Sequence, residues 1–515
     1  GMLNKLKALG CVAFSALCLI PNSLTAQEVQ APTASQQAQV NLFTIPNQSA
    51  SYVRMPARQA SQEIDAVFFN PAGTVNLDEG FHFTFNNQML NQWVEIENDY
   101  VFFDGPKSYS GKASGYIFPS TFLAYKKGNW NFHGGIMMVA GAGGAKFSDL
   151  PASDRGVADI IPALQASFLN TIDADEAALG NYANYSGLTD YRYNFESQGV
   201  GFSPGGLLGF AYKVNDWVSV GAQVRYAQQV TQAEGYVTDI EVYHPELGGW
   251  QSPENYLYLV EDSTGSTIAG LAALAYADLG GDRYIDVKQQ DGAFTPIVSI
   301  QLTPHEDIVI AAKYEHKTDF DLVTQVIDGK DGGGVYTDQE VISSDLPAYL
   351  GLGVSYTPND KLTLAYSFKQ RFFKQADLNG REEEIESNQN ENEFAIEYAF
   401  TPRLAVSGGY SYYNSAGFKP TYHRDGDFLL SAHSIAGGAA FNVSDKTRLN
   451  VGALFTQSIP QTHTLPHLYA DGEAIAVEPA GYVPEYEATF RKRSLIFSVG
   501  VDMYFGKKST NNNSL

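Results

Sequence analysis

The stretch SLIFSVGVDMYF (residues 494–505), near the end of the chain, alternates between large apolar side chains and small or polar ones. An alternation of period two places the two sets on opposite faces of a β-strand. The apolar set is Leu495, Phe497, Val499, Val501, Met503 and Phe505, and the opposite set includes Ser498, Gly500 and Asp502. One face of this strand is therefore apolar along its whole length, while the other is small or charged.

The same pattern recurs upstream, clearly in KLTLAYSFK (361–369) and WVSVGAQVRY (217–226). Strands about ten residues long are common among chains that cross a membrane as β-barrels. The pattern predicts about fourteen strands, near 80–97, 116–125, 130–140, 206–214, 217–229, 294–302, 308–317, 348–357, 361–372, 392–400, 404–413, 434–442, 447–457 and 494–505.

Short polar turns and long polar loops alternate as the connections between successive predicted strands. Pro, Asn, Asp and Gly provide the backbone angles or the hydrogen bonds that tight turns need. The turns are KKGN (126–129), VND (214–216), TPHED (303–307), TPND (357–360), TPR (401–403) and NVSDK (442–446). We therefore expect six hairpins, with both ends of the barrel segment on the short-turn side.

The polar face of the strands distinguishes between two all-β folds. A soluble sandwich would bury its apolar face and expose its polar face to water. Here the polar face combines small residues with isolated charges, namely Arg225, Lys313, Glu315, Lys369 and Asp502, which suits a hydrated lumen. The 31 Tyr, 31 Phe and 48 Gly suit aromatic girdles and a narrow interior. We predict a 14-stranded antiparallel transmembrane β-barrel of the bacterial outer membrane, with the sandwich as the alternative.

The N-terminus has the three parts of a secretory signal. Lys5 and Lys7 precede the apolar run at residues 8–20, and SLTA (23–26) offers a cleavage site after Ala26. Thirteen apolar residues are too few to cross a bilayer as a helix. We therefore predict a signal peptide over residues 1–26 and export of the rest.

Composition excludes several functions. Cys11 and Cys18, the only two cysteines, lie in the predicted signal peptide, so the mature chain has no thiol for disulfides or metal sites. The net charge of −24 disfavours nucleic acid as a partner. Pro466 interrupts the helix that would aim His463 and His467 at one metal. We expect no enzyme activity, no cofactor and no metal site.

A barrel of fourteen strands must either conduct or be plugged, because its interior is too wide for barrel side chains to fill. Residues 27–79 precede the first strand and are long enough to form a plug. Near the end of this segment stands DAVFFNPAG (65–73). Taken alone, Asn70 and Pro71 are typical of a capped turn behind an apolar anchor.

DAVFFNPAG, followed at once by the strand FHFTF (81–85), resembles the FadL family of outer-membrane long-chain fatty-acid transporters, which includes aromatic-hydrocarbon channels. The resemblance implies a fourteen-stranded barrel whose lumen holds an N-terminal hatch, with the hatch motif at Asn70, Pro71 and Ala72, followed by Gly73. The expected organisation is a signal peptide (1–26), a hatch (27–79), a barrel with long extracellular loops (80–505) and a polar tail (506–515).

The resemblance also implies sideways release of substrate through a gap at the third strand, WNFHGGIMMVAGAGGAKF (130–147). Glycines weaken strand pairing because they bring no side chain to pack. The candidates for this opening are Gly134, Gly135, Gly141, Gly143 and Gly144. The Pro-Phe-Gly pattern that the family often carries late in this strand is absent, and close packing against the hatch is the alternative role for these glycines.

Substrate capture is expected in the outer loops. In STIAGLAALAYADL (266–279), Ile268, Leu271 and Leu274 form one helical stripe that could line an apolar groove, and loop 318–347 is the family's other groove contributor. A second helix is predicted over 157–172; capping the barrel mouth is the alternative role for both helices. Three lumen-facing cations are the candidates to bind a carboxylate head group, namely Arg225, Lys313 and Lys369. Pairing with acidic residues of the lumen is the alternative role for each of them.

The sequence thus predicts passive, hatch-gated uptake of a long-chain fatty acid or similar hydrophobic molecule by a monomer in the outer-membrane lipid. A diffusion pore for small polar solutes is one alternative. A structural or adhesive surface barrel is another.

Overall fold

A computed structural model describes most of the chain. The described residues are 48–101, 103–147, 149, 151–158, 188–245, 248–264, 282–332, 336–423, 428–466 and 485–506. The predicted signal peptide, the first part of the predicted hatch and most of the polar tail lie outside them. No helix in these ranges is long and apolar enough to cross a membrane.

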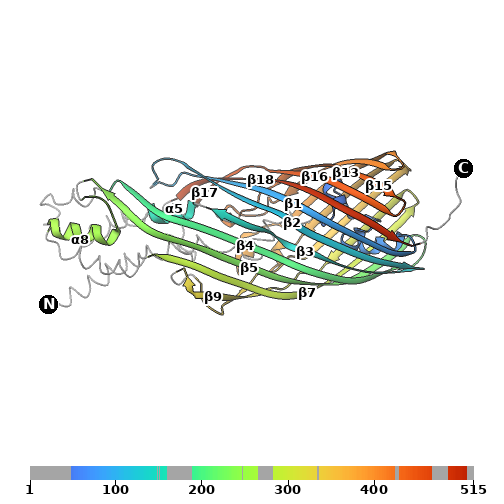
Figure 1. Cartoon of the computed structure of the whole chain (residues 1–515), viewed down its shortest axis with the longest axis horizontal. Coiled ribbons are helices and arrows are strands. Elements are labelled where there is room, and N and C mark those ends of the chain that lie inside the picture. Colours follow the sequence, from blue (N-terminus) through green and yellow to red (C-terminus); the bar gives the residue numbers. More distant parts are fainter. Residues whose placement is uncertain are drawn as a thin grey trace.

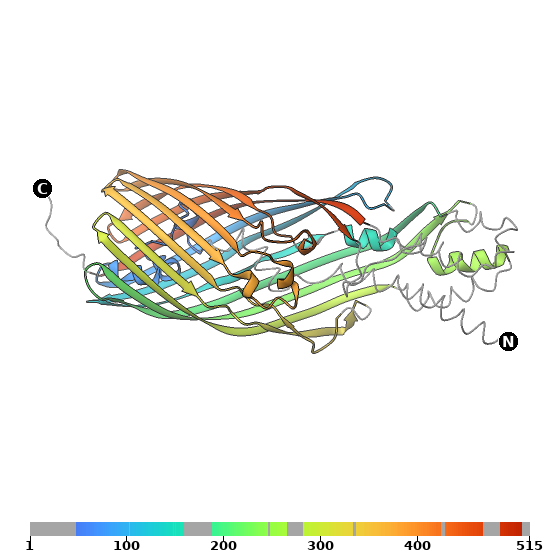
Figure 2. The same cartoon turned by 180° about the vertical axis from the view of Figure 1, so that it is seen from behind.

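Fourteen long strands close into one antiparallel barrel (Figures 1 and 2). Each pairs with its neighbour along the chain, and β1 pairs with β18 from Phe81↔Phe505 to Asn98↔Ala488, which closes the wall. The fourteen are β1 (Gly80–Asn98), β2 (Lys107–Lys127), β3 (Trp130–Phe147), β4 (Asp190–Lys213), β5 (Val218–His244), β7 (Arg283–His305), β8 (Ile308–Glu315), β11 (Tyr349–Asn359), β12 (Leu362–Arg371), β13 (Gln389–Thr401), β14 (Leu404–Asn414), β15 (Ala432–Ser444), β16 (Thr447–Ser458) and β18 (Glu485–Phe505). The predicted barrel is confirmed.

Four shorter strands extend the wall on the long-loop side. They are β6 (Gly249–Gln251), β9 (Asp321–Asp331), β10 (Val341–Ser343) and β17 (Gln461–Pro466). They pair with the outer parts of β5, β7, β9 and β18. Strands β4, β5 and β7 are the longest part of this extension and reach far beyond the neighbouring strands (Figure 1).

The short turns close one end of the barrel, as predicted. Asn215 and Asn359 each use their side-chain oxygen to accept backbone N–H groups two and three residues further on. These bonds fix the chain reversal before β5 and before β12. The start of β1 and the end of β18 lie at the same end (Figure 1).

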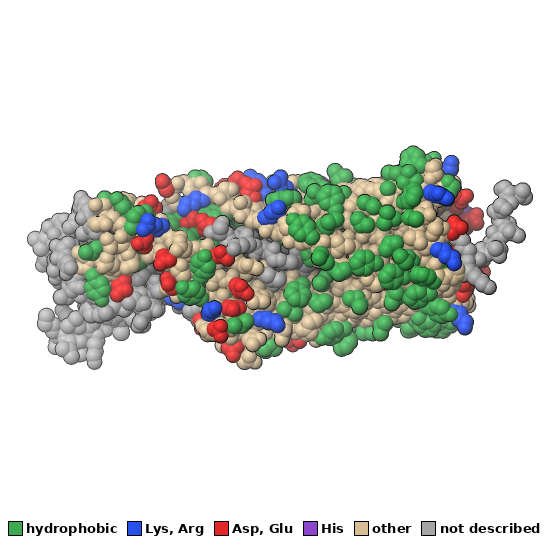
Figure 3. Space-filling model, in the orientation of Figure 1, with side chains coloured by type: hydrophobic (Ala, Val, Ile, Leu, Met, Phe, Trp, Pro, Cys, Tyr) green, Lys and Arg blue, Asp and Glu red, His purple; other side chains and the backbone are tan. Residues whose placement is uncertain are grey.

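The two faces of the wall differ as the alternation requires. On β13, Phe394 and Ile396 face outward and are 53% and 50% exposed, while Glu393 faces inward and is fully buried. Side chains of this kind cover the short-turn half of the barrel as a green apolar band (Figure 3). The band marks the part of the wall that faces lipid.

The described helical segments lie in two places. Inside the barrel near the short turns lie α3 (Ala50–Arg54), α4 (Ala66–Phe69) and the 3-10 helix η2 (Pro71–Asn76), drawn in blue (Figure 2). On the long-loop side lie α5 (Pro151–Ala158), α8 (Pro253–Thr264), η4 (Phe373–Gln375), η5 (Arg381–Glu384) and η6 (Pro420–Tyr422). The helix predicted over 157–172 overlaps α5 only at its first two residues, and the rest lies outside the described residues.

Candidate functional site: the hatch and the facing barrel wall

Residues 48–79, which we call the hatch, fold as three short helical turns linked by irregular chain. Such short helices are not stable alone and depend on their surroundings. Ser49 caps α3 by accepting the backbone N–H of Tyr52 at 3.0 Å, and its hydroxyl donates to the Asp65 carboxylate at 3.0 Å. The cap of the first turn is thus tied to the start of the second turn, because Asp65 is the N-cap residue of α4.

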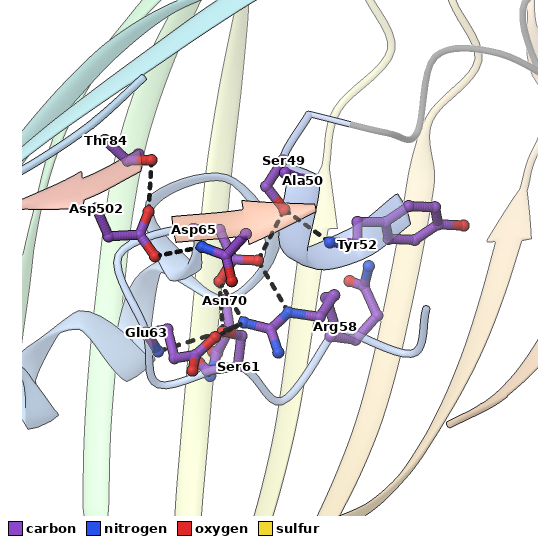
Figure 4. A network of polar contacts seen from close by, with 12 residues as sticks. Ser49, Ala50, Tyr52, Arg58, Ser61, Glu63, Asp65, Asn70, Thr84 and Asp502 are labelled. Atoms are coloured by element: carbon purple, nitrogen blue, oxygen red, sulfur yellow. Dashed lines mark hydrogen bonds and ion pairs between the residues drawn. The ribbon is translucent and has the colours of Figure 1, made fainter. Parts of the chain in front are cut away.

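A buried arginine organises the middle of the hatch (Figure 4). The Arg58 guanidinium donates two bonds to the Asp65 carboxylate, at 2.8 and 2.7 Å, and one to the Ser61 hydroxyl at 2.8 Å. It also pairs with Glu63. A guanidinium held by both oxygens of one carboxylate is fixed in direction as well as position.

Glu63 links this hydrogen-bond network around Arg58 to the barrel. Its second oxygen accepts from Arg448 of β16 at 2.7 Å. Burial alone would raise the pKa of the Glu63 carboxyl, but the guanidinium groups of Arg448 and Arg58 hold this pKa well below its ordinary value. The carboxylate therefore stays charged at neutral pH and holds both arginines.

Arg54, at the end of α3, is fully buried in the barrel wall. It donates to Asn450 of β16 at 3.1 Å and to Ser407 of β14 at 2.8 Å, and it pairs with Glu397 of β13. Removing one partner of such a buried pair costs about 3–5 kcal/mol, because the other charge is left uncompensated. Three strands of the wall thus hold one hatch side chain.

Glycines on the lumen face make room for the hatch backbone. A Cβ atom added at Gly452 would lie 2.5 Å from the Arg54 nitrogen, and one at Gly353 would lie 2.5 Å from the Ala60 nitrogen. Contacts that short require the backbone to shift. Among the described glycines of the barrel strands, those at which an added Cβ would lie within 3 Å of a hatch atom are Gly221, Gly351, Gly353, Gly409, Gly438, Gly452 and Gly500. The barrel wall is therefore shaped to this particular plug.

The predicted hatch motif lies at the contact with β5 and β7. The buried Asn70 amide donates to the Ser61 carbonyl at 2.9 Å and to the Gln301 side chain at 2.7 Å. The Ala72 N–H donates to the Ser299 hydroxyl at 2.9 Å, and its carbonyl accepts from Ser219 at 2.8 Å. Asn70 thus ties an earlier hatch loop to the wall.

Pro71 and the Gly73 that follows the motif fix the backbone at this contact. Pro71 begins η2, where a missing N–H costs nothing. A Cβ at Gly73 would lie 2.4 Å from the Asn70 amide nitrogen, so only glycine fits beside it. The motif is a docking element between hatch and barrel, and its role in gating stays a prediction.

The three predicted head-group cations all have protein partners. Lys313 donates to the Phe68 carbonyl of the hatch and to Glu315, both at 2.7 Å. Arg225 pairs with the same Glu315 at 2.8 Å. These contacts attach β5 and β8 to the hatch. Head-group binding by these cations stays a prediction, and their pairing with lumen acids is the arrangement seen.

Lys369 forms a similar attachment two strands from Lys313, since both lysines are register partners of Gly351. Its ammonium group donates to the Tyr52 hydroxyl at 3.1 Å and pairs with Glu393, and the Tyr52 hydroxyl also donates to Glu393. Tyr52 belongs to α3, so this buried triad connects the hatch to β12 and β13.

A break in the wall lies between β2 and β3. The two strands pair at Ala113↔Ala145 and again at Thr121↔Ile136. Between these two points, the described residues of β2 and β3 form no ladder pairs with each other. We call this segment, residues 114–120 of β2 and 137–144 of β3, the gap. The seven residues of β2 that have no partner on β3 correspond to about 23 Å of missing ladder between the two strands.

The predicted glycines divide at this gap. Gly134 and Gly135 lie in the regularly paired part of β3, opposite Leu123 and Phe122. Gly141, Gly143 and Gly144 lie within the gap, where the pairing of β3 with β4 also shifts register. The three late glycines therefore accompany the break, while the early pair does not.

The hatch reaches the inner side of the gap. The Gln48 carbonyl accepts from Ser120 of β2, and its amide donates to the Met138 carbonyl of β3. Next to this bridge, Phe68 packs with Phe122 and Val139 in one apolar cluster. Both sides of the gap are thus held through hatch residues.

A second apolar cluster lies on the long-loop side of the same strands. Phe320 and Leu322, from loop 318–347, are fully buried against Ala140 of β3, and Val139 packs against this cluster too. Val139 therefore joins an apolar surface supplied by an outer loop to one supplied by the hatch. The predicted groove residues Ile268, Leu271 and Leu274 lie outside the described residues.

The sequence reasoning missed the charges of the hatch itself. Arg54, Arg58, Glu63 and Asp65 stand within twelve residues in SYVRMPARQASQEID (51–65). Charged side chains in a segment already predicted to enter a lumen need partners, and that requirement was the available signal. The partners on the wall are several hundred residues away, so only the fold identifies them.

Comparisons with known proteins agree with this architecture. Residues 31–453 match the family described as "Outer membrane protein transport protein (OMPP1/FadL/TodX)". A FadL homologue of Pseudomonas aeruginosa is similar in structure, with TM-score 0.53, 14% identity, and coverage of 89% of this chain and 98% of that one.

The toluene transporter TodX of Pseudomonas putida is similar too, with TM-score 0.51, 13% identity, and coverage of 88% of this chain and 97% of that one. At these identities the structural likeness shows the fold alone. The comparison with curated proteins finds no match.

Proposed function

We infer that this chain, which belongs to the outer membrane protein transport family OMPP1/FadL/TodX, is a passive, hatch-gated channel for long-chain fatty acids or other small hydrophobic molecules. Substrate is captured among the outer loops, passes to the hatch, and leaves sideways into the bilayer. Transfer of apolar surface from water into protein and then into lipid supplies the driving force, at about 25 cal/mol per Å².

The observation that carries this proposal is the continuous apolar surface beside the gap. Val139 packs against the cluster that contains the loop residues Phe320 and Leu322, and also against the cluster on which Phe68 of the hatch packs. A hydrophobic molecule moving along this surface would stay out of water from the outer loop to the break in the wall. The route ends where β2 and β3 are unpaired.

The hatch suits a gate because of how it is attached. Side chains of the wall hold it, through Asn70, Arg54 and Tyr52, and no backbone ladder joins its described residues to the barrel. Side-chain bonds can be exchanged one at a time, whereas the closed ladder of the barrel stays intact. A shift of the hatch would change the lumen without unfolding the wall.

The gap suits an exit because it faces lipid. Tyr116 and Ile117, in the unpaired part of β2, are 63% and 78% exposed on the outer side. On the inner side, the Gln48 bridge spans the two strands. Release of that bridge would open the wall between an apolar interior and the bilayer.

A diffusion pore for polar solutes is less well supported. Such a pore needs a continuous wet path, whereas Ala50, Val53 and Ala66 of the hatch have no exposed surface. An adhesive barrel would not require the close fit between hatch and wall.

The test is uptake of labelled oleate and of labelled toluene by cells that lack their own transporter. Cells making the native chain, the Asn70→Ala/Pro71→Ala variant and an empty control are compared at equal surface levels. We expect the native chain to raise uptake of at least one substrate and the variant to change that rate. If no hydrophobic substrate exceeds control while a small sugar does, the polar pore replaces this proposal.

A further inference from the structure

Two unpaired cations stand on the outer wall just beyond the apolar band. Lys112 of β2 and Arg493 of β18 are register partners of the same residue, Trp93 of the intervening β1. Side chains opposite one another in antiparallel strands share a face, so all three project outward. The Lys112 ammonium lies 5.7 Å and the Arg493 guanidinium 5.3 Å from the centre of the Trp93 ring.

The position of this cluster follows from the strand below it. From Phe505 at the short-turn end to Leu495, the outward residues of β18 are all apolar, and Phe497 and Val499 are 45% and 43% exposed. Ten residues of tilted strand rise by about 25 Å, which is the height of the apolar band of such barrels. Arg493 is the next outward residue, at the level of the outer-leaflet head groups. Figure 3 shows Lys and Arg side chains at this border, above the part of the wall where Figure 1 draws β1 and β18.

No described acidic residue balances the charges of the cluster. In the described chain neither Lys112 nor Arg493 has a carboxylate within ion-pair distance. Arg491, one outward position further from the membrane, does have partners, since it pairs with Glu97 at 2.7 Å and approaches Glu95 at 3.7 Å. Acidic residues outnumber basic ones by 57 to 33, so two neighbouring cations without an acid are unusual in this chain.

We propose that Lys112, Trp93 and Arg493 form a binding site for the phosphorylated head group of an outer-leaflet glycolipid. The two cations stand two strands apart, a backbone separation of roughly 10 Å, and both lean toward one ring, so their charged ends can reach one phosphate group. The indole supplies an apolar platform at the water boundary. The acyl chains of the same lipid would lie against the apolar band below.

The site has a defined relation to the gap. Lys112 precedes the unpaired segment of β2 by two residues, and Ile117 of that segment faces lipid. A lipid held at this site would therefore line the outer edge of the gap. The proposal concerns lipid binding alone and stands or falls independently of transport.

The experiment is a native mass spectrometry titration of the purified full chain with bisphosphorylated lipid A. The Lys112→Gln/Arg493→Gln variant should bind it at least roughly ten-fold more weakly, because two charge-assisted bonds to phosphate are lost. Lys361→Gln/Arg403→Gln, an equal charge change in the short turns, should leave binding within about two-fold of native. The charge-preserving Lys112→Arg/Arg493→Lys variant should retain most of the binding and shows that the site tolerates substitution.

Three results would overturn the proposal. The first is that the Lys112→Gln/Arg493→Gln variant binds lipid A as tightly as the native chain does. The second is that dephosphorylated lipid A binds the native chain as tightly as the phosphorylated form does. The third is that an excess of inorganic phosphate displaces the lipid completely, which would make this a site for free phosphate.

Discussion

Asn70→Ala should loosen the hatch while leaving the barrel intact. The substitution removes two hydrogen bonds, to the Ser61 carbonyl at 2.9 Å and to Gln301 at 2.7 Å, and leaves both acceptors buried. Each lost bond that leaves its acceptor buried without a donor costs about 1–2 kcal/mol, in the lower part of the range for such groups. A total of about 2–4 kcal/mol would raise the ratio of displaced to seated hatch by roughly 30-fold to 1,000-fold.

Native-state hydrogen exchange measures this ratio segment by segment. Amides of residues 48–79 should exchange faster by that factor in Asn70→Ala, while amides of the barrel strands keep the native rate. Asn76→Ala is the matched control, because the Asn76 amide donates one bond at 3.1 Å to Gly73 within the hatch. The reasoning is refuted if hatch exchange changes by less than about three-fold, or if barrel and hatch accelerate together.

Three further perturbations test other contacts of the hatch and the gap. Gly438→Val should displace the hatch and raise single-channel conductance, because its Cβ would lie 2.5 Å from the Arg54 Cβ. Gly437→Ala should leave the conductance unchanged, because its Cβ would have no neighbour closer than 3.8 Å. Deletion of Gly141 leaves seven residues in each strand of the gap, so the ladder can close, and uptake should be lost at unchanged surface level. Glu63→Gln should speed hatch exchange by roughly ten-fold or more, because its two arginine partners lose their shared carboxylate; an unchanged rate would assign no anchoring role to that carboxylate.

The membrane-facing half of the barrel was predictable because its signals are local. Alternation and turn residues are read within ten residues, and all fourteen strands and six short turns were found in this way. The outer extensions were missed. Strand β5 runs to His244 rather than 229, because beyond the lipid its outward residues, such as Gln232 and Glu234, are polar and the apolar alternation ends.

The candidate site was predictable only in part. The motif at Asn70 and the inward direction of Lys369 follow from short patterns in the sequence. The partner of Lys369 on the hatch is Tyr52, 317 residues away, and no local pattern contains such a pairing. The gap depends on a register mismatch between two strands, which the glycines of β3 suggest but cannot locate.

The gating role of the hatch is tested most directly by locking it to the wall. A Cβ at Gly500 would lie 2.9 Å from the Ala50 Cβ, so Ala50→Cys/Gly500→Cys can form a disulfide after a small shift and a turn of the Asn86 side chain. The only native cysteines, Cys11 and Cys18, lie in the predicted signal peptide, so the new pair should be unique in the mature chain.

Uptake of a labelled hydrophobic substrate that the native chain transports is measured in cells making the double-cysteine chain, before and after mild reduction, with each single-cysteine chain as control. A gate predicts little uptake when the disulfide is formed and recovery of uptake on reduction. Equal uptake in the oxidised and reduced states would contradict the proposal that the hatch moves during transport.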